Sequence, residues 1–176
     1  EYLFSRDNDI PWNCKDDLKH FYNLTKGNII LMGSKTYESL KMPNGFTNRF
    51  NIVLTSNTNK YSHIVNDNII FLDSLDKSLC FINNQSILNT FSRFESIHNE
   101  TFIIGGLNLF NQILYEKKYL NLINNVYQSI IINTFENKHY DNNQYIPKDW
   151  KLILNKQFFI KVKNNYDNFR VIKYLN

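Results

Sequence analysis

Short apolar runs separated by polar breaks recur along the chain, and their spacing predicts alternating strands and helices. The runs are rich in β-branched and aromatic residues and are mostly continuous, which is typical of strands buried on both faces of a sheet. The predicted strands are Asn28–Met32, Asn51–Leu54, Ile69–Leu72, Thr101–Ile104, Asn125–Ile132, Lys151–Phe159 and Phe169–Tyr174. The predicted helices are Lys15–Leu24, Thr36–Leu40, Ser74–Asn83 and Leu107–Leu114.

The order of these elements indicates an α/β fold. Strands alternate with helices through the first two thirds of the chain, which predicts a twisted, mostly parallel central sheet flanked by about four helices. The last strands follow one another without helices and predict an antiparallel C-terminal edge. At 176 residues the chain has the size of one domain, so we expect a single domain over residues 1–176. The polar stretch Gln85–Glu100 is either a surface insertion or an extension of the helix before it.

Composition and charge narrow the class of protein. Hydrophobic residues make up 43% of the chain and charged residues 20%, which favours a packed core over disorder. The net charge of +4 comes from scattered lysines, so we expect a solvated surface and no nucleic-acid partner. The apolar runs are too short to cross a bilayer, and no charged-then-apolar leader opens the chain. We therefore expect a cytoplasmic protein without a membrane partner.

Cysteines and histidines give no pattern of a metal site. Cys14 and Cys80 have neither disulfide nor metal spacing, which fits a reducing cytosol. The histidines at positions 20, 63, 98 and 139 share no spacing with an acid or a cysteine. We therefore interpret all four histidines as non-catalytic and expect no metal.

Asp17 is predicted to lie on the apolar face of the first helix. Asn13 can cap this helix, and Asp16 is a solvent-facing acid of its first turn. Asp17 instead shares a face with Phe21 and Leu24, where a carboxylate is costly unless it has a partner. It is either a second first-turn acid that favours the helix dipole, or a functional acid with a raised pKa that can hold or deliver a proton.

Two segments run from a strand into glycine and then into a helix, namely Gly33-Ser34-Lys35-Thr36 and Gly105-Gly106-Leu107. Free N–H groups at a helix start suit phosphate, Lys35 adds positive charge, and paired glycines let the backbone approach a ligand closely. The first segment does not fit a P-loop, because the required first glycine would stand at position 28, which is Asn28. Each turn alone is consistent with an ordinary tight turn. Together they suggest two phosphate-sized cradles, as a dinucleotide needs.

Arg49 is one of four arginines in a chain that otherwise prefers lysine. It precedes a predicted strand, and its planar fork suits a carboxylate. Taken alone, it is either an ordinary surface arginine or a carboxylate clamp.

These segments, in this order, resemble the dihydrofolate reductase family. The similarity covers nearly the whole chain, and it rests on five motifs: Asp7-Asn8-Asp9-Ile10-Pro11-Trp12, which looks like the mobile active-site loop, Asp17-Leu18-Lys19-His20-Phe21, which looks like the acid-bearing helix, Met32–Ser39, Arg49–Ser56, and Ile104-Gly105-Gly106 with Phe110. The resemblance implies an α/β fold and NADPH-dependent reduction of 7,8-dihydrofolate. Some members are fused to thymidylate synthase, so a fused or downstream synthase domain is a partner that the resemblance allows.

The resemblance also implies a role for each matched residue. Asp17 would pair with the pterin ring and promote its protonation, Trp12 would join it at the catalytic site and close with Ile10 over the nicotinamide, and Arg49 would grip the α-carboxylate of the glutamyl tail. The folate cleft would be lined by Leu18, Phe21, Leu40, Phe46 and Ile104. The adenosine half of NADPH would be held by Gly33, Lys35, Thr36, Thr55 and Ser56. The pyrophosphate cradle would be Gly105, Gly106, Leu107, Asn108 and Leu109, with Phe110 near the nicotinamide.

Several positions depart from the family pattern. Only residues 1–6 precede Asp7, so the hydrophobic N-terminal strand of the family is expected to be absent, leaving an open place beside Thr101–Ile104. Ser34 and Ser56 stand where many members carry a basic residue for the 2′-phosphate, which leaves the preference for NADPH over NADH open. Gln128 stands where threonine is usual near the acid, and Asn137 where an aspartate often braces the mobile loop.

Two alternatives to this function remain open. One is a reductase of riboflavin synthesis, which shares the fold and does not need the pair of Asp17 and Arg49. The other is a non-catalytic module that binds folate or a nucleotide without turnover.

Overall fold

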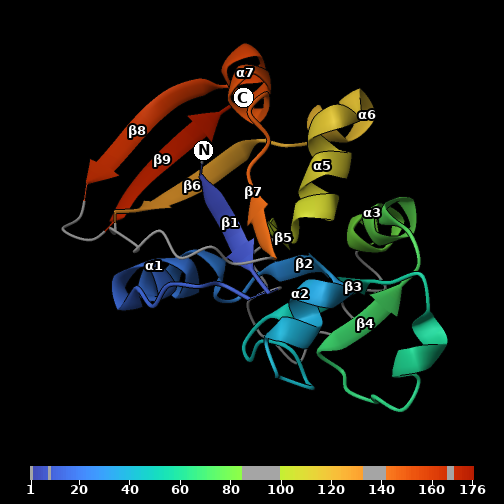
Figure 1. The fold of residues 1–176 in the computed structure, drawn as a ribbon. Coiled ribbons are helices and arrows are strands. Elements are labelled where there is room, and N and C mark those ends of the chain that lie inside the picture. Colours follow the sequence, from blue (N-terminus) through green and yellow to red (C-terminus); the bar gives the residue numbers. More distant parts are fainter. Residues whose placement is uncertain (1, 8, 85–99, 133–141, 166–168) are drawn as a thin grey trace. The chain divides into compact units, whose positions relative to one another are not determined.

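A computed structural model describes residues 2–7, 9–84, 100–132, 142–165 and 169–176 of the chain, and the trace is drawn in Figure 1. The chain divides into two compact units. The terminal unit comprises Glu1–Phe21 with Phe110–Asn176, and the middle unit comprises Tyr22–Leu109.

The middle unit is built on a four-stranded, all-parallel sheet with the order β4-β3-β2-β5 (Figure 1). Side chains of β2 and β3 are almost completely buried, which explains why their sequences are continuous apolar runs rather than alternating ones. The strands are β2 (Ile29–Gly33), β3 (Phe50–Leu54), β4 (Ile69–Leu72) and β5 (Thr101–Gly105). The predicted parallel sheet is therefore confirmed, with each strand within one residue of its predicted bounds.

Among the described residues, the middle unit also holds α2 (Ser34–Ser39), α3 (Leu75–Asn83) and the 3₁₀ turn η1 (Thr58–Tyr61). The Ser74 hydroxyl caps α3 by accepting from the Lys77 N–H, and the Phe81 ring of α3 stacks on Phe50 of β3 with centroids 5.6 Å apart. In a second aromatic cluster, the rings of Tyr37 in α2 and Tyr61 in η1 pack on Phe71 of β4, with centroids 5.4 and 4.5 Å from the Phe71 centroid. These contacts fix α2 and η1 at the ends of the strands.

The terminal unit contains antiparallel strands. β9 lies between β6 and β8, and a separate pair joins β1 to β7. The bounds are β1 (Leu3–Arg6), β6 (Asn125–Ile131), β7 (Asn143–Tyr145), β8 (Phe159–Asn165) and β9 (Phe169–Leu175). The antiparallel C-terminal strands expected from the sequence are confirmed.

Helices α6 (Lys117–Leu120) and α7 (Trp150–Gln157) belong to the terminal unit, while α1 (Lys15–Thr25) and α5 (Leu107–Tyr115) begin in one unit and end in the other. One core cluster of the terminal unit joins Leu120, Leu154, Phe158 and Tyr174. A second cluster contains Cys14, Phe169 and Val171. Both clusters pack apolar side chains of helical or loop segments on the antiparallel strands.

The predicted strand Lys151–Phe159 is wrong. Residues Trp150–Gln157 form helix α7, and strand β8 begins only at Phe159. The reason is the spacing of the buried side chains: Trp150, Leu154 and Phe158 recur every four residues, while Leu152 between them is 62% exposed. The apolar run Leu-Ile-Leu resembles a strand only when this longer period is overlooked.

The start of the chain also differs from expectation. Leu3–Arg6 forms a short strand, which pairs antiparallel with β7. Strand β5 pairs with β2, and within the residues that the structure describes no other strand is hydrogen-bonded to it. Residues 85–99 make up most of the polar stretch Gln85–Glu100, and they lie outside the described residues, as does Asn137.

Candidate functional site

The carboxyl ends of three parallel strands meet at one edge of the middle sheet. Gly33 at the end of β2 lies opposite Leu54 at the end of β3, and Met32 lies opposite Gly105 at the end of β5. This edge of a parallel α/β sheet is where ligands usually bind. The sequence motifs singled out as phosphate cradles therefore leave the sheet side by side.

The two glycine turns lie in contact. A Cβ atom built on Gly33 would lie 3.8 Å from the Gly105 carbonyl oxygen and from the Gly106 nitrogen. A Cβ atom on Gly106 would lie only 3.1 Å from the Thr36 hydroxyl, which is a tight contact. Gly105 has a φ of 109°, in the region that favours glycine. These glycines thus serve the close approach of two backbone segments.

The turn after β3 adds polar groups to the same edge. The Thr55 side chain is buried, and its hydroxyl accepts a hydrogen bond from the Asn57 N–H at 3.2 Å. Ser56 is exposed, as are Lys35 and Asn108. Backbone donors, hydroxyls and one lysine therefore lie along the edge, and no carboxylate is among the residues proposed to hold the cofactor.

A cluster around Glu38 lies next to this edge and was not predicted from the sequence. The Glu38 carboxylate accepts hydrogen bonds from Lys60 Nζ and, at 2.6 Å, from the Tyr61 hydroxyl. The Lys60 bond, followed by the Tyr61 bond, holds the pKa of Glu38 below its usual range, and the charge of Lys35 adds to this effect. Burial raises the pKa values of Tyr37 and Tyr61. Lys60 is therefore paired with an acid.

Arg49 is buried, with 3% of its surface exposed. Its Nε donates to the Thr25 hydroxyl at 3.0 Å, and its Nη1 donates to the Thr47 carbonyl at 3.0 Å. Its Nη2 lies 3.4 Å from the Tyr22 carbonyl, and the rings of Tyr22 and Phe46 have centroids 4.9 and 5.3 Å from Cζ. Burial lowers the pKa of Arg49, yet a guanidinium remains charged at neutral pH. Arg49 is thus not an ordinary surface arginine.

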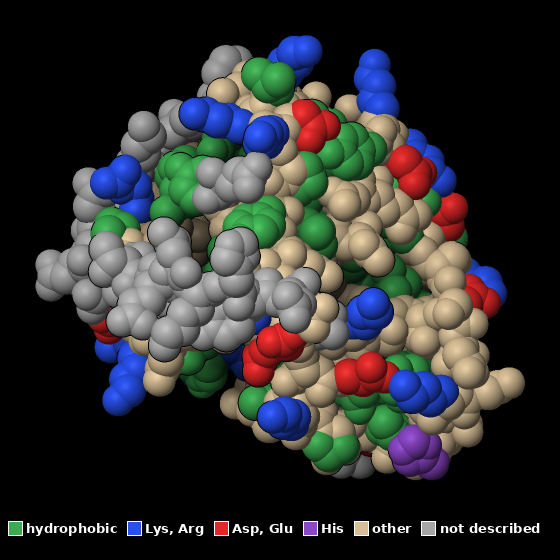
Figure 2. Space-filling view, viewed as in Figure 1, with side chains coloured by type: hydrophobic (Ala, Val, Ile, Leu, Met, Phe, Trp, Pro, Cys, Tyr) green, Lys and Arg blue, Asp and Glu red, His purple; other side chains and the backbone are tan. Residues whose placement is uncertain are grey.

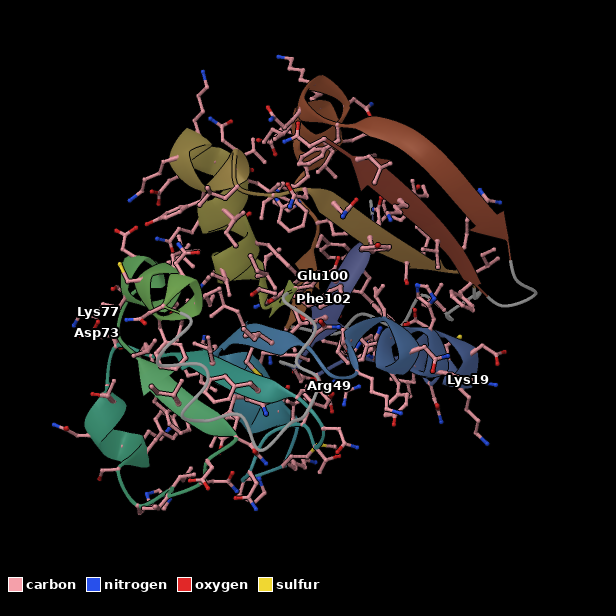
Figure 3. The ribbon with its side chains drawn as sticks, turned by 180° about the vertical axis from the view of Figure 1, so that it is seen from behind. Lys19, Arg49, Asp73, Lys77, Glu100 and Phe102 are labelled. Carbon is pink, nitrogen blue, oxygen red and sulfur yellow. The ribbon has the colours of Figure 1, made fainter. Side chains whose placement is uncertain are left out.

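Figure 3 shows the contrast between Arg49, which lies within the fold, and Lys19, which points away from helix α1 into solvent. Asp73 and Lys77 lie together in the same view and form an ion pair of 2.6 Å at the start of α3. Exposed pairs of this kind contribute little to stability. The guanidinium of Arg49 is instead oriented by several contacts at once.

Helix α1 carries the acid that the sequence singled out. Asp17, Phe21 and Leu24 are all half-buried, whereas Asp16 is exposed, so the predicted shared face is confirmed. Leu18, next to the acid, is 55% exposed although it is apolar. The first hydrogen bond of the helix joins the Leu18 N–H to the Cys14 carbonyl, so the cap position is one residue later than the predicted Asn13.

The aromatic residues expected near the nicotinamide lie in the terminal unit. Trp12 packs against the cluster of Cys14, Phe169 and Val171, while Ile10 is 57% exposed. The Phe110 ring makes edge contacts with Phe4 and Trp150, each with centroids 6.0 Å apart. Gln128, on β6, accepts a hydrogen bond from the Tyr174 hydroxyl at 3.1 Å.

The structure therefore gathers the predicted residues into two groups. The middle unit holds Gly33, Lys35, Thr36, Leu40, Phe46, Arg49, Thr55, Ser56, Ile104, Gly105, Gly106, Leu107, Asn108 and Leu109. The terminal unit holds Ile10, Trp12, Asp17, Leu18, Phe21 and Phe110. Sequence reasoning missed Thr25 and Asn51, which support Arg49 and its loop. The one available signal was a polar Asn51 inside a predicted buried strand.

On the face drawn in Figure 2, Lys and Arg side chains are scattered among acidic and apolar ones and do not gather into a single basic patch. Across the residues that the structure describes, no three His, Cys, Asp or Glu side chains come together as a metal site. No helix in the same part of the chain is long and apolar enough to cross a membrane.

Comparison with known proteins identifies related sequences. The family model described as "Dihydrofolate reductase" matches residues 2–175. A dihydrofolate reductase from Buchnera aphidicola subsp. Baizongia pistaciae is 33% identical over 97% of this chain and 90% of its own length. A dihydrofolate reductase from Bacillus subtilis is 30% identical over 94% of this chain and 83% of its own length.

A solved structure supports the fold. It is described as dihydrofolate reductase from Enterococcus faecalis complexed with NADP(H) and RAB-propyl. It is 22% identical, matches with a TM-score of 0.60, and the match covers 97% of this chain and 87% of that chain.

Proposed function

Since the chain belongs to the dihydrofolate reductase family, we propose that it reduces 7,8-dihydrofolate to 5,6,7,8-tetrahydrofolate with NADPH as the reductant. The observation that carries this proposal for the chain itself is the contact between the two glycine turns at the carboxyl edge of the parallel sheet. The product would serve one-carbon metabolism and nucleotide biosynthesis.

The middle unit fits a dinucleotide. A Cβ atom at Gly106 would crowd the Thr36 hydroxyl, Gly105 has a φ that favours glycine, and Gly33 lies in contact with both residues, with the Thr36 and Thr55 hydroxyls along the same edge. These residues would hold the adenosine half and the pyrophosphate, together with Lys35, Ser56, Leu107, Asn108 and Leu109. NADPH, when bound, supplies the hydride that the pterin receives at C6.

The choice of NADPH over NADH would rest on few charges. Lys60 is hydrogen-bonded to Glu38, and Lys35 is an exposed cation at the start of α2. A 2′-phosphate would interact with Lys35 and with the hydroxyls of Ser34 and Ser56. We therefore expect a preference for NADPH that weakens with increasing salt.

The terminal unit would supply the proton. Asp17 is a half-buried carboxylate in the first turn of α1, with the exposed apolar Leu18 next to it and Phe21 one turn later. Asp17 would hold the pterin ring and promote proton delivery to N5, while Leu18 and Phe21 would contact the flat rings. Trp12, Ile10 and Phe110 would shield the nicotinamide from water.

Arg49 would bind the tail of the substrate. Its guanidinium is held by Thr25, Thr47 and two aromatic rings, so little side-chain entropy remains to be lost on binding a carboxylate. Leu40, Phe46 and Ile104 would line the cleft between the tail and the pterin. Arg49 would thus determine affinity rather than the rate of the chemical step.

We place the reaction in the cytosol, because the two cysteines, Cys14 and Cys80, are free thiols of the kind that a reducing compartment preserves. The relatives named above are matched over 83–90% of their own length, which leaves no room in them for a second enzyme. A fused or downstream thymidylate synthase domain stays a prediction for this chain.

Turnover of NADPH with 7,8-dihydrofolate tests the proposal. The purified chain is expected to oxidise NADPH only when dihydrofolate is present, with tetrahydrofolate as the product by chromatography. Binding of both ligands without turnover would instead identify a non-catalytic binding module. Turnover of the pyrimidine substrate of riboflavin synthesis, and not of dihydrofolate, would identify the other reductase of this fold.

A further inference from the structure

Asn51 is a fully buried polar residue in strand β3, surrounded by apolar strand residues. Its relative exposure is 0%, and its neighbours Phe50 and Ile52 are 1% and 0% exposed. An amide in such a place is costly unless its donors and acceptor are all used. We therefore expect the role of the Asn51 side chain to lie in the hydrogen bonds that it makes.

Those hydrogen bonds hold the loop that leads to Arg49, the residue proposed to bind the tail carboxylate of the substrate. Asn51 Oδ1 accepts from the Phe46 N–H at 2.9 Å, and Asn51 Nδ2 donates to the Phe46 carbonyl at 3.0 Å. Nδ2 also lies 3.1 Å from the carbonyls of Arg49 and Asn68. One amide thus pairs with both backbone groups of Phe46, fixes the backbone of Arg49, and ties both to the chain before β4.

Gly45 allows the loop backbone to pack closely against the side-chain amide of Asn51. A Cβ atom at Gly45 would lie 2.6 Å from Asn51 Cγ and 2.7 Å from Oδ1, far inside any real contact. Its φ of +66° is also one that glycine tolerates and other residues resist. The loop over residues 45–49 therefore packs on the Asn51 side chain at both ends. Gly45 contacts it at one end, and the Arg49 carbonyl accepts its hydrogen bond at the other.

We propose that Asn51 is a positioning residue for recognition of the substrate's tail carboxylate. Its amide fixes the backbone of Phe46 and Arg49, so that the Arg49 guanidinium lies against Thr25 and between the rings of Tyr22 and Phe46. The inference rests on the proposed function. It adds a determinant of specificity that touches no substrate and acts through Arg49.

A comparison of tailed and tail-less substrates tests this role. 7,8-Dihydropteroate lacks the glutamyl tail of 7,8-dihydrofolate and otherwise carries the same reacting ring. In the wild type, kcat/KM should be higher for dihydrofolate. In Asn51→Ala and Gly45→Ala this preference should fall by about tenfold, because a misplaced guanidinium loses a charge-assisted hydrogen bond. The loss should lie in KM for dihydrofolate, with kcat and the dihydropteroate kinetics changed by less than about threefold.

Asn44→Ala is the matched control, since Asn44 is an exposed asparagine directly before this loop. It should keep the preference of the wild type. Equal losses for both substrates in Asn51→Ala and Gly45→Ala, an unchanged preference in either folded variant, or failure of both variants to fold would overturn the inference and leave Asn51 with a role in the fold alone. A wild type inactive on both substrates would overturn the proposed function itself.

Discussion

The guanidinium of Arg49 is fixed by the Thr25 hydroxyl, the Thr47 carbonyl and two aromatic rings within the folded chain. Such a group meets a ligand carboxylate with its geometry already set, and most of its desolvation cost has been met by folding. Asp17 is in a different position, because it is half-buried on a helix with an exposed leucine next to it. At the scale of single residues, Arg49 is proposed to bind the tail carboxylate and Asp17 to deliver the proton.

Arg49→Lys should raise KM for dihydrofolate by about tenfold or more and change kcat much less. An ammonium group cannot reproduce the planar fork that donates to Thr25 and Thr47, and it would bind a carboxylate as a single point charge. Steady-state kinetics with dihydrofolate measure both constants. Unchanged affinity for folates that carry the glutamyl tail would refute the assignment.

Asp17→Asn should reduce turnover of dihydrofolate by about 10²-fold or more and leave NADPH affinity nearly unchanged, since an amide cannot deliver a proton. Asp16→Asn is the control on the same helical turn, because Asp16 is exposed. It should cost at most about 1 kcal/mol of stability through the helix dipole and leave turnover intact. Near-full activity of Asp17→Asn at neutral pH would show that the proton has another source.

At the scale of elements, sequence patterns were informative where local and tertiary preferences agree. Strands β2 and β3 could be predicted because their apolar runs are buried on both faces, and β4 and β5 because their short runs are apolar and β-branched. Helix α7 could not, because its apolar run is strand-like and its true period depends on which side chains face the core. Strand β7 is three residues long, begins with two polar residues and, among the described residues, pairs with β1.

The candidate site follows the same rule. Glycine turns after strands carry a local signal, so Gly33 and Gly105-Gly106 could be found from the sequence. The contact of Thr25 with Arg49 joins residues 24 positions apart, and no local pattern reports it. The hydrogen bonds of the Asn51 side chain to the Phe46 backbone likewise depend on how the loop folds back onto β3, and no local sequence pattern reports them.

Leu154→Ala should lower the free energy of unfolding by about 2–5 kcal/mol, because Leu154 is 5% exposed in the core cluster that α7 covers. Leu152→Ala, on the solvent side of the same helix, should change it by less than about 0.5 kcal/mol. Urea denaturation measures both values. Similar losses for the two variants would argue for alternating strand burial and against helix α7.

Glu38→Gln should destabilise the protein near neutral pH by at most about 1 kcal/mol, because the carboxylate is 44% exposed. The pKa of Glu38 in the folded state lies below its ordinary value of 4.5, so its contribution is present above that value and lost as the pH falls through the folded pKa. The difference between variant and wild type should therefore narrow as the pH falls below 4.5 and through the lowered pKa of Glu38. Denaturation curves over a series of acidic pH values check this, with Glu116→Gln, whose carboxylate is 4.0 Å from Lys118 Nζ, as the control.

At the scale of the whole molecule, the residues proposed for the cofactor are concentrated in the middle unit, and the antiparallel strands β8 and β9 of the terminal unit contain none of them. A ligand that binds only the folded state stabilises it by mass action, by about 2.7 kcal/mol at a concentration one hundred times Kd. For a chain of this size that corresponds to a rise in Tm of roughly 5–10 °C. NADPH should therefore protect the chain both globally and at a defined set of amides.

Hydrogen exchange with and without NADPH, under conditions where local opening dominates, separates the two effects. Added protection should centre on residues 33–36, 54–57 and 105–109, where the three strand ends meet. The amides of β8 and β9 are the internal control and should change little. NADH should give the same pattern with less stabilisation, because it lacks the phosphate that Lys35 would attract. Protection confined to β8 and β9, or a Tm that does not respond to either nucleotide, would contradict a cofactor site at the carboxyl edge of the parallel sheet.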